Sequence, residues 1–173
     1  MEQFPQAQPK LALIQHGHWV DYYPHTQTKL QARRKLGICP QSYVFLFIGL
    51  CRIYKYIPGL IEAICKLPSN ALLLIAGRFQ RDDYQRKVLT MAKSDKLIKT
   101  FPGYMPDQEL QDYLSACDCL VLPYLEILTS GSAMVALSFG RPVVSVKMAF
   151  LKDIVTDYDF STNQTTLMVF IKH

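Results

Sequence analysis

The sequence of 173 residues contains no apolar run that approaches the roughly 20 residues needed for a membrane-spanning helix. The polar residues 1–10 do not include the apolar stretch of a secretory signal peptide. Internal repeats and low-complexity tracts are also absent. Half of the residues are hydrophobic and only 19% are charged, so the chain is expected to fold around a core rather than to be disordered. These features predict a cytoplasmic folded protein.

Metal-ligating residues are few, with five cysteines and four histidines. The cysteine count is odd, and Cys117 and Cys119 are separated by one residue, which is not a zinc-ribbon spacing. His16 and His18 have no third ligand nearby in the sequence. We therefore expect no metal site, and five reduced thiols that pack like small hydrophobic side chains.

The formal net charge is +5, and lysine and arginine are scattered without the interleaved aromatics of a nucleic-acid-binding surface. We expect no nucleic-acid partner. The modest charge is compatible with an anionic ligand, with a membrane surface or with an ordinary solvated exterior.

Short apolar runs alternate with segments of helical periodicity. Several runs are apolar at nearly every position, which is typical of strands buried on both faces of a parallel sheet. The runs are residues 11–14, 44–50, 72–77, 98–101, 119–123 and 142–146.

Four helices are predicted between these runs. The helices are residues 58–67, begun by Pro58; a helix capped by Asp82 or Asp83 and ending at Ala92; a helix capped by Asp107; and a helix capped by Ser130 or Ser132 that runs through Ser138 to Gly140. The strands recur every 20 to 27 residues, as in repeated βα units.

The predicted fold class is α/β, a Rossmann-like doubly wound parallel sheet in a three-layer sandwich. We expect residues 1–24 to form an entry strand and linker, residues 25–155 the main domain, and residues 156–173 a tail too short for a further βα unit.

Ligands of open α/β sheets bind beyond the carboxyl ends of the strands. After the second run, Gly49 permits a close backbone approach, and Arg52 and Lys55 place two cations beside a helix N-terminus, which favours a phosphate or pyrophosphate. Taken alone, Arg52 and Lys55 can equally well be interpreted as two solvent-exposed cations of a loop.

Three further strand ends carry candidate residues. Gly77 suggests a tight turn, and the loop at Gly103 and Tyr104 offers backbone groups and an aromatic face to a nucleobase. The segment Thr129, Ser130, Gly131 and Ser132 enters a helix directly from a strand, where free amides can hold an anion. Glu126 is the carboxylate beside this turn and can accept hydrogen bonds from sugar hydroxyls; a capped helix with a surface glutamate is the plainer alternative.

Several short motifs occur in a fixed order over residues 11–155. They are His16-Gly17, Tyr23-Pro24, Arg33, Leu36-Gly37-Ile38, Phe47-Ile48-Gly49, Arg52, Tyr54-Lys55, Leu74-Ile75-Ala76-Gly77, Phe101-Pro102-Gly103, residues 113–118, Leu122-Pro123, and residues 138–144. Together this ordered set resembles the GT-B glycosyltransferases of group 1 (family 4), and specifically their C-terminal, donor-binding domain.

The resemblance implies hexosyl transfer from a nucleotide-diphosphate sugar to a hydroxyl acceptor, in surface polysaccharide biosynthesis, with no cofactor beyond that donor. It implies that Arg52 and Lys55 hold the donor pyrophosphate, that Gly103 and Tyr104 lie along the base, and that residues 129–132 hold phosphate or sugar. Glu126, Arg52 and Lys55 are then the expected catalytic residues. The acceptor, a saccharide or a lipid-linked molecule, would meet a missing N-terminal domain, at the inner face of the membrane if the enzyme is peripheral.

Two features depart from the family pattern. The family has a second glutamate at the position of Met134, eight residues after Glu126, and that glutamate usually holds the ribose. The N-terminal acceptor domain is also absent, so we expect the chain alone to be inactive.

Two other functions remain open on the sequence. A nucleotide-sugar epimerase half would need further acids and histidines in the cleft, and a non-catalytic nucleotide-binding module would bind a nucleoside diphosphate without turnover. A receiver-type signalling domain fits less well, because residues 14–16 supply no acidic cluster.

Overall fold

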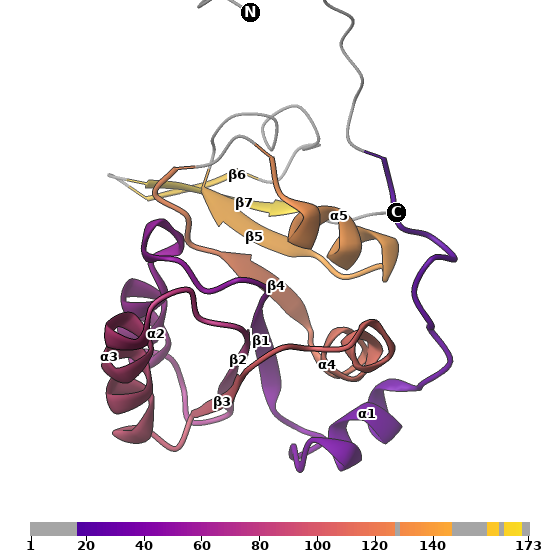
Figure 1. Ribbon diagram of the computed structural model, residues 1–173, viewed down its shortest axis with the longest axis horizontal. Coiled ribbons are helices and arrows are strands. Elements are labelled where there is room, and N and C mark those ends of the chain that lie inside the picture. Colours follow the sequence, from indigo (N-terminus) through magenta and orange to yellow (C-terminus); the bar gives the residue numbers. More distant parts are fainter. Residues whose placement is uncertain (1–16, 127–128, 147–158, 163–164, 171–173) are drawn as a thin grey trace, which may run out of the picture.

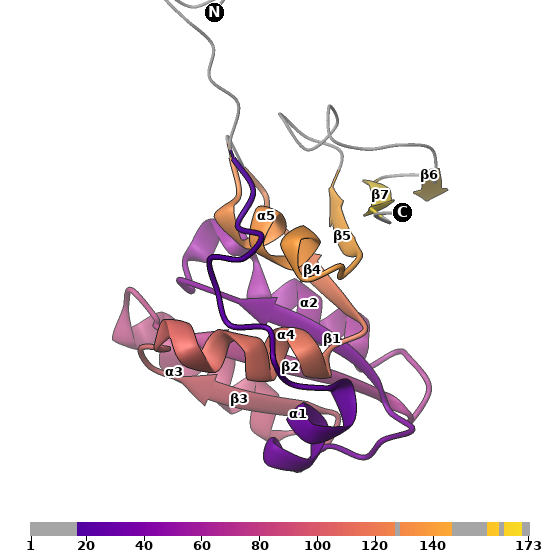
Figure 2. The same cartoon turned by 90° about the vertical axis from the view of Figure 1, so that its right-hand side faces the viewer.

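A central β-sheet lies between two layers of helices in the computed structural model, which describes residues 17–126, 129–146, 159–162 and 165–170 (Figures 1 and 2). Helices α2 and α3 cover one face, and α1, α4 and α5 cover the other. This arrangement confirms the three-layer α/β sandwich that the alternating pattern predicted.

The strand order is β3-β2-β1-β4-β5-β7-β6, with β1 to β5 parallel. The strands are β1 (Tyr43–Ile48), β2 (Ala71–Gly77), β3 (Ile98–Pro102), β4 (Cys119–Leu122), β5 (Val143–Val146), β6 (Asp159–Thr162) and β7 (Thr165–Phe170). Five predicted runs form β1 to β5, and the run at 11–14 lies outside the described residues.

The last two strands were not predicted. Strand β7 pairs antiparallel with β5, and β6 pairs antiparallel with β7. Antiparallel strands need only a short turn between them, so residues too few for a βα unit suffice to extend the sheet.

The helices are α1 (Lys29–Lys35), α2 (Ile57–Ile64), α3 (Asp82–Lys93), α4 (Leu110–Ala116) and α5 (Gly131–Ser138), with short 3-10 turns at Ile53–Lys55 and Asp107–Glu109. Helix α1 was not predicted from the sequence, although Thr28 and Gln31 form a capping box at its start.

Two predicted helix caps were wrong. Arg81 occupies the cap position of α3, with Asp82 and Asp83 inside the first turn, and Asp107 begins a 3-10 turn ahead of α4. Acidic residues in a first turn stabilise the helix through its dipole without capping an amide. Ser130 does cap α5, where its hydroxyl accepts a hydrogen bond from the Ala133 amide at 3.2 Å.

The apolar runs form the core between the layers. All seven residues of β2 are buried, as expected for a parallel strand covered by helices on both faces. All five cysteines are free thiols, and Cys51, Cys117 and Cys119 are buried. Cys39 and Cys65 are exposed, so the expectation that every thiol is packed was wrong for these two, which lie outside the strands.

An entry segment and α1 are fastened to the sheet through polar side chains. The Arg33 guanidinium is buried, donates to the Ala116 carbonyl at 3.0 Å, and pairs with Asp118 at 2.8 Å. Upstream, the Trp19 amide donates to the Ser138 hydroxyl at 2.9 Å, and the segment runs past α5 and α4 to α1 (Figure 2). These bonds hold the amino-terminal side of the described chain against the α4–α5 face.

We expect Ser130→Ala to lower the free energy of unfolding by about 1 kcal/mol, because the Ala133 amide loses its cap. Denaturant titration measures this, and Thr90→Ala, at an exposed position of α3, serves as the control with a change within about 0.5 kcal/mol. Equal stabilities of the two variants would contradict the capping role.

Candidate functional site

The chain reverses its direction of winding across the sheet between β1 and β4. From β1 it proceeds outward through β2 to β3, and then returns to place β4 on the other side of β1. Loops that leave two such neighbouring strands in opposite directions open a crevice beyond their carboxyl ends. The segments after β1 and β4, residues 49–55 and 123–126, therefore flank the expected binding crevice.

Two hydrogen bonds join these flanking segments. The Leu125 amide donates to the Tyr54 carbonyl at 2.8 Å, and the Ser132 hydroxyl donates to the Ile48 carbonyl at 3.0 Å. The start of α5 is thus fixed against the end of β1, and the two sides of the crevice are held together by the fold itself.

Glycines permit an unusually close backbone approach at this edge. Gly49 and Gly77 have φ values of +121° and +141°, which side-chain-bearing residues rarely adopt. A Cβ atom built on Gly77 would lie 1.9 Å from the Gly49 carbonyl oxygen. Beyond the glycines the two loops pair again, because the Cys51 amide donates to the Arg78 carbonyl at 2.8 Å. The loop that carries Arg52 and Lys55 is therefore held by backbone bonds.

Lys55 is buried, with 8% of its surface exposed. Its ammonium lies 5.7 Å from the centre of the Phe47 ring and 5.0 Å from that of Tyr124. No carboxylate of the described residues forms an ion pair with it. Burial, together with a smaller contribution from the neighbouring Arg52 charge, lowers the pKa of Lys55 to about 8, whereas Cys51 acts in the opposite direction. The site thus holds a cation that has no carboxylate partner within the described ranges.

The amino-terminal end of α5 meets Lys55 at Gly49. An added Cβ on Gly49 would lie 3.7 Å from the Lys55 nitrogen and 3.1 Å from the Ser132 hydroxyl oxygen. The amides of Gly131 and Ser132 have no hydrogen-bond partner within the described part of the chain. Free amides, the positive end of the helix dipole and a buried ammonium together favour an anion at this point.

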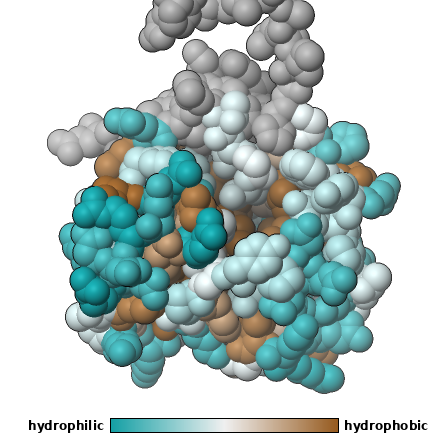
Figure 3. Space-filling model, viewed as in Figure 1, coloured by the Kyte–Doolittle hydropathy of each residue, from teal (hydrophilic) through white to brown (hydrophobic). Residues whose placement is uncertain are grey.

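Two hollows open beside this point. Gly49, Gly77, Gly103 and Tyr104 line one of 320 Å³, over the ends of β1, β2 and β3. In the space-filling view, hydrophobic atoms show in a depression near the middle of the face, between more hydrophilic surroundings (Figure 3). The exposed ring of Tyr104, at 79%, is open to a ligand from solvent.

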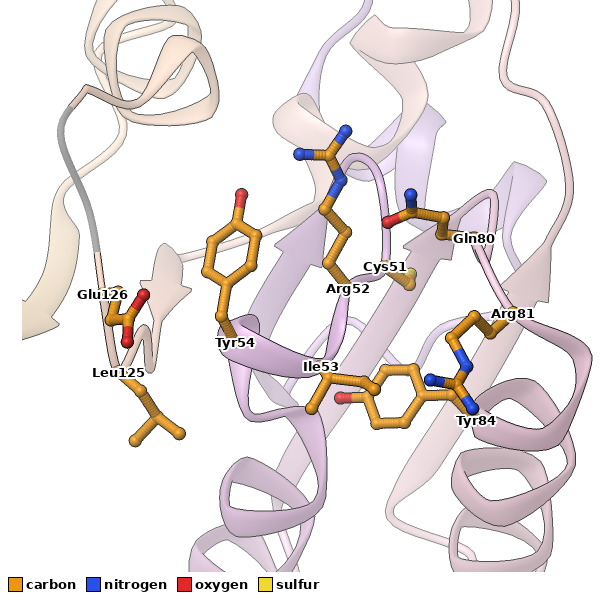
Figure 4. A pocket seen from close by; sticks show the side chains of 9 residues that line it. All are labelled: Cys51, Arg52, Ile53, Tyr54, Gln80, Arg81, Tyr84, Leu125 and Glu126. Carbon is orange, nitrogen blue, oxygen red and sulfur yellow. The ribbon is translucent and has the colours of Figure 1, made fainter.

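Arg52 and Glu126 line the second hollow, of 590 Å³, together with Tyr54 and Arg81 (Figure 4). Tyr54 lies between Arg52 and Glu126, which come from the loops after β1 and β4. Arg52 was predicted to share one phosphate site with Gly49 and Lys55, and in the structure Arg52 and Gly49 line different hollows.

The aromatic residues around Lys55 were missed in the sequence. The rings of Phe47 and Tyr124 lie against a buried cation, and the Tyr124 ring meets that of Tyr54 edge to face at 6.0 Å. Glu126 was selected because ligands of open α/β sheets bind beyond the carboxyl ends of the strands. Tyr124 is the second residue after β4, so the same rule, here called the strand-end rule, applies to it as well.

The described residues contain neither a metal-ligating cluster nor a helix that could span a membrane. Over the described ranges, no three histidine, cysteine or acidic side chains gather where they could hold a metal ion. Within the same part of the chain, every helix is too short or too polar to cross a bilayer.

Comparison with known proteins gives a family match. The model of the family described as glycosyl transferases group 1 matches residues 28–168. A curated relative, GDP-mannose:glycolipid 4-beta-D-mannosyltransferase of Xanthomonas campestris pv. campestris, is 28% identical over 142 residues, which is 82% of this chain and 38% of the relative. The chain therefore spans well under half the length of that relative.

Two solved structures share the fold. The crystal structure of HepE from Anabaena, in complex with UDP and glucose, superposes with a TM-score of 0.63 at 19% identity, covering 72% of this chain and 35% of HepE. The C-terminal domain of a group 1 glycosyl transferase from Francisella tularensis superposes with a TM-score of 0.61 at 21% identity, covering 79% of this chain and 73% of that domain.

Proposed function

This chain belongs to the glycosyl transferases group 1 family, and on that premise we propose that its crevice between β1 and β4 binds the diphosphate of a nucleotide-sugar donor. One observation carries the proposal: the uncompensated Lys55 ammonium and the free amides of α5 converge at Gly49. The neighbouring hollows then accommodate the two ends of the donor, and no cofactor is required beside it.

The proposed reaction is hexosyl transfer to a hydroxyl group. The bond between the anomeric carbon and the distal phosphate oxygen breaks, the acceptor oxygen bonds to that carbon, and the acceptor proton is lost. Negative charge builds on the departing diphosphate, where Lys55, Arg52 and the amides of Gly131 and Ser132 stabilise it. Stabilisation of a developing charge by groups already in place is a large catalytic effect and needs no metal ion.

The remaining roles are assigned by position. Tyr104 and Gly103 line the smaller hollow and are proposed to contact the base, while Thr129 and Ser130 shape the turn before the free amides. Glu126 lines the larger hollow and is proposed to accept hydrogen bonds from sugar hydroxyls. Met134 has no polar group with which to hold the ribose.

The acceptor is proposed to bind outside this chain. The chain spans 38% of the glycolipid-modifying relative, and residues 28–168 match the family model. We propose that a further domain binds a saccharide or lipid-linked acceptor at the cytoplasmic face of the membrane, in surface polysaccharide synthesis, and that the chain alone transfers no sugar. The family match favours transfer over the epimerase alternative.

Calorimetric titration with UDP and with GDP tests the donor site. We expect one of these nucleotides to bind, and Arg52→Ala to weaken its binding by roughly ten-fold, the effect of one charge-assisted contact. Arg86→Ala, at an exposed position of α3, is the matched control and should change nothing. Failure of both nucleotides to bind would contradict the proposal, and sugar transfer by the purified chain alone would contradict its dependence on a further domain.

A further inference from the structure

Tyr124 presents a buried hydroxyl that the described residues leave without a hydrogen-bond partner. Only 3% of the residue is exposed, and its ring lies under the Lys55 ammonium at 5.0 Å. A buried hydroxyl without a partner is unfavourable, and such groups in folded proteins call for an explanation. The feature therefore points to a group that is supplied from outside the chain.

The neighbouring hydroxyls each hold a hydrogen bond of their own. The Tyr124 hydroxyl lies beside the side chains of Ser130 and Ser132, without meeting hydrogen-bond geometry with either. Ser132 donates to the Ile48 carbonyl, and Ser130 accepts from the Ala133 amide. Burial raises the pKa of Tyr124 to about 12, so the hydroxyl keeps its proton near neutral pH and can donate it in a hydrogen bond.

The surroundings of this hydroxyl select the chemistry of the missing partner. The Lys55 ammonium lies over the tyrosine ring, and the start of α5, with the free amides of Gly131 and Ser132, lies beside the hydroxyl. These surroundings include a buried ammonium and two free amides, so the fitting partner is an anionic oxygen that accepts several hydrogen bonds.

Resting on the proposed function, we propose that Tyr124 is a further phosphate-binding residue, whose hydroxyl donates a hydrogen bond to the donor diphosphate while its ring holds Lys55 in place. The residue thus contacts the ligand directly and also orients the main cation. The hydroxyl is left unpaired in the free protein and becomes paired when the diphosphate binds.

Tyr124→Phe separates the two parts of this role, because it keeps the ring and removes the hydroxyl. We expect affinity for the nucleoside diphosphate to fall roughly ten-fold, as for loss of a hydrogen bond to a charged group. Affinity for the corresponding nucleoside, which lacks phosphate, should stay unchanged. The unfolding temperature without ligand should stay level or rise, because no partnered hydroxyl has been lost. Tyr113→Phe, at another buried tyrosine, is the control.

Three results would overturn the inference. Diphosphate affinity of Tyr124→Phe within two-fold of the unchanged protein would show that the hydroxyl does not contact phosphate. A lower unfolding temperature without ligand would show that the hydroxyl stabilises the fold itself. Failure of the unchanged protein to bind any nucleoside diphosphate would remove the proposed function as well, whereas the first two results leave that function standing.

Discussion

Gly77→Ala is expected to lower the free energy of unfolding by about 3 to 5 kcal/mol, through backbone strain at positive φ together with a steric clash. The added Cβ would lie 1.9 Å from the Gly49 carbonyl oxygen, and a main-chain atom cannot turn away as a side chain can. Relief requires β1 and β2 to separate at their carboxyl ends, which also displaces Gly49 from Lys55. Denaturant titration gives the stability, and nucleotide titration of any folded fraction gives the effect on the site.

Gly103→Ala is the matched control, because Gly103 has a φ of +136° but an added Cβ would meet nothing within 4 Å. This variant has the backbone strain without the clash, so we expect its free energy of unfolding to fall by about 1 to 2 kcal/mol. Equal losses in the two variants would show that strain alone explains the requirement for glycine, and that the contact between Gly77 and Gly49 is unimportant.

Lys55→Met is expected to weaken nucleoside diphosphate binding by about 100-fold while raising the stability of the free protein by about 1 kcal/mol. Methionine fills the space between the Phe47 and Tyr124 rings but carries no charge to pair with phosphate. In the free protein the ammonium is buried without a counter-charge, so its removal relieves a desolvation cost that exceeds the two cation–π contacts.

The lowered pKa of Lys55 determines how the stability of the free protein and its affinity for the diphosphate change with pH. Between about pH 8 and 10.5 the folded protein releases the Lys55 proton while the unfolded chain keeps it, so the free protein gains stability as pH rises through this range. Binding changes in the opposite direction. Affinity for the diphosphate should fall roughly ten-fold between pH 7 and 9, because only the charged form of the Lys55 amine pairs with phosphate. The phosphate itself ionises near pH 6 and does not change its charge over this range.

Calorimetry at pH 7, 8 and 9 measures this dependence, with thermal unfolding of the free protein in parallel. Lys55→Met should bind weakly and equally at all three values. Lys87→Met, at an exposed position of α3, should retain both the affinity and the pH dependence of the unchanged protein. A pH profile that is the same with and without Lys55 would show that another group governs it.

The central sheet could be predicted because its strands are apolar at nearly every position. Residues buried on both faces leave a pattern that single-sequence reasoning detects, and β1 to β5 follow the predicted runs within a few residues. Helix α1 was missed because its sequence, KLQARRK, is mostly polar; it is held by the Arg33–Asp118 pair, which joins residues 85 positions apart. Strands β6 and β7 depend on pairing with β5, which a local pattern does not specify.

The site was predicted to the extent that the strand-end rule applies. It selected Gly49, Lys55 and Ser132, which the structure brings to one point. The contact of Lys55 with two rings could not be foreseen, because Phe47 lies in β1 and Tyr124 follows β4, and only the tertiary fold makes these two strands neighbours. Arg52 illustrates the opposite case: three residues before Lys55 in the same loop, it remains exposed and lines a different hollow.

The most direct test is to map nucleoside diphosphate binding on the isotopically labelled chain by amide chemical shifts. The account predicts that the largest saturable shifts fall on Gly49, Gly131 and Ser132, and that inorganic pyrophosphate reproduces them. Shifts confined to the α2–α3 face, around Glu62 and Met91, would show that the anion binds elsewhere and would contradict the account.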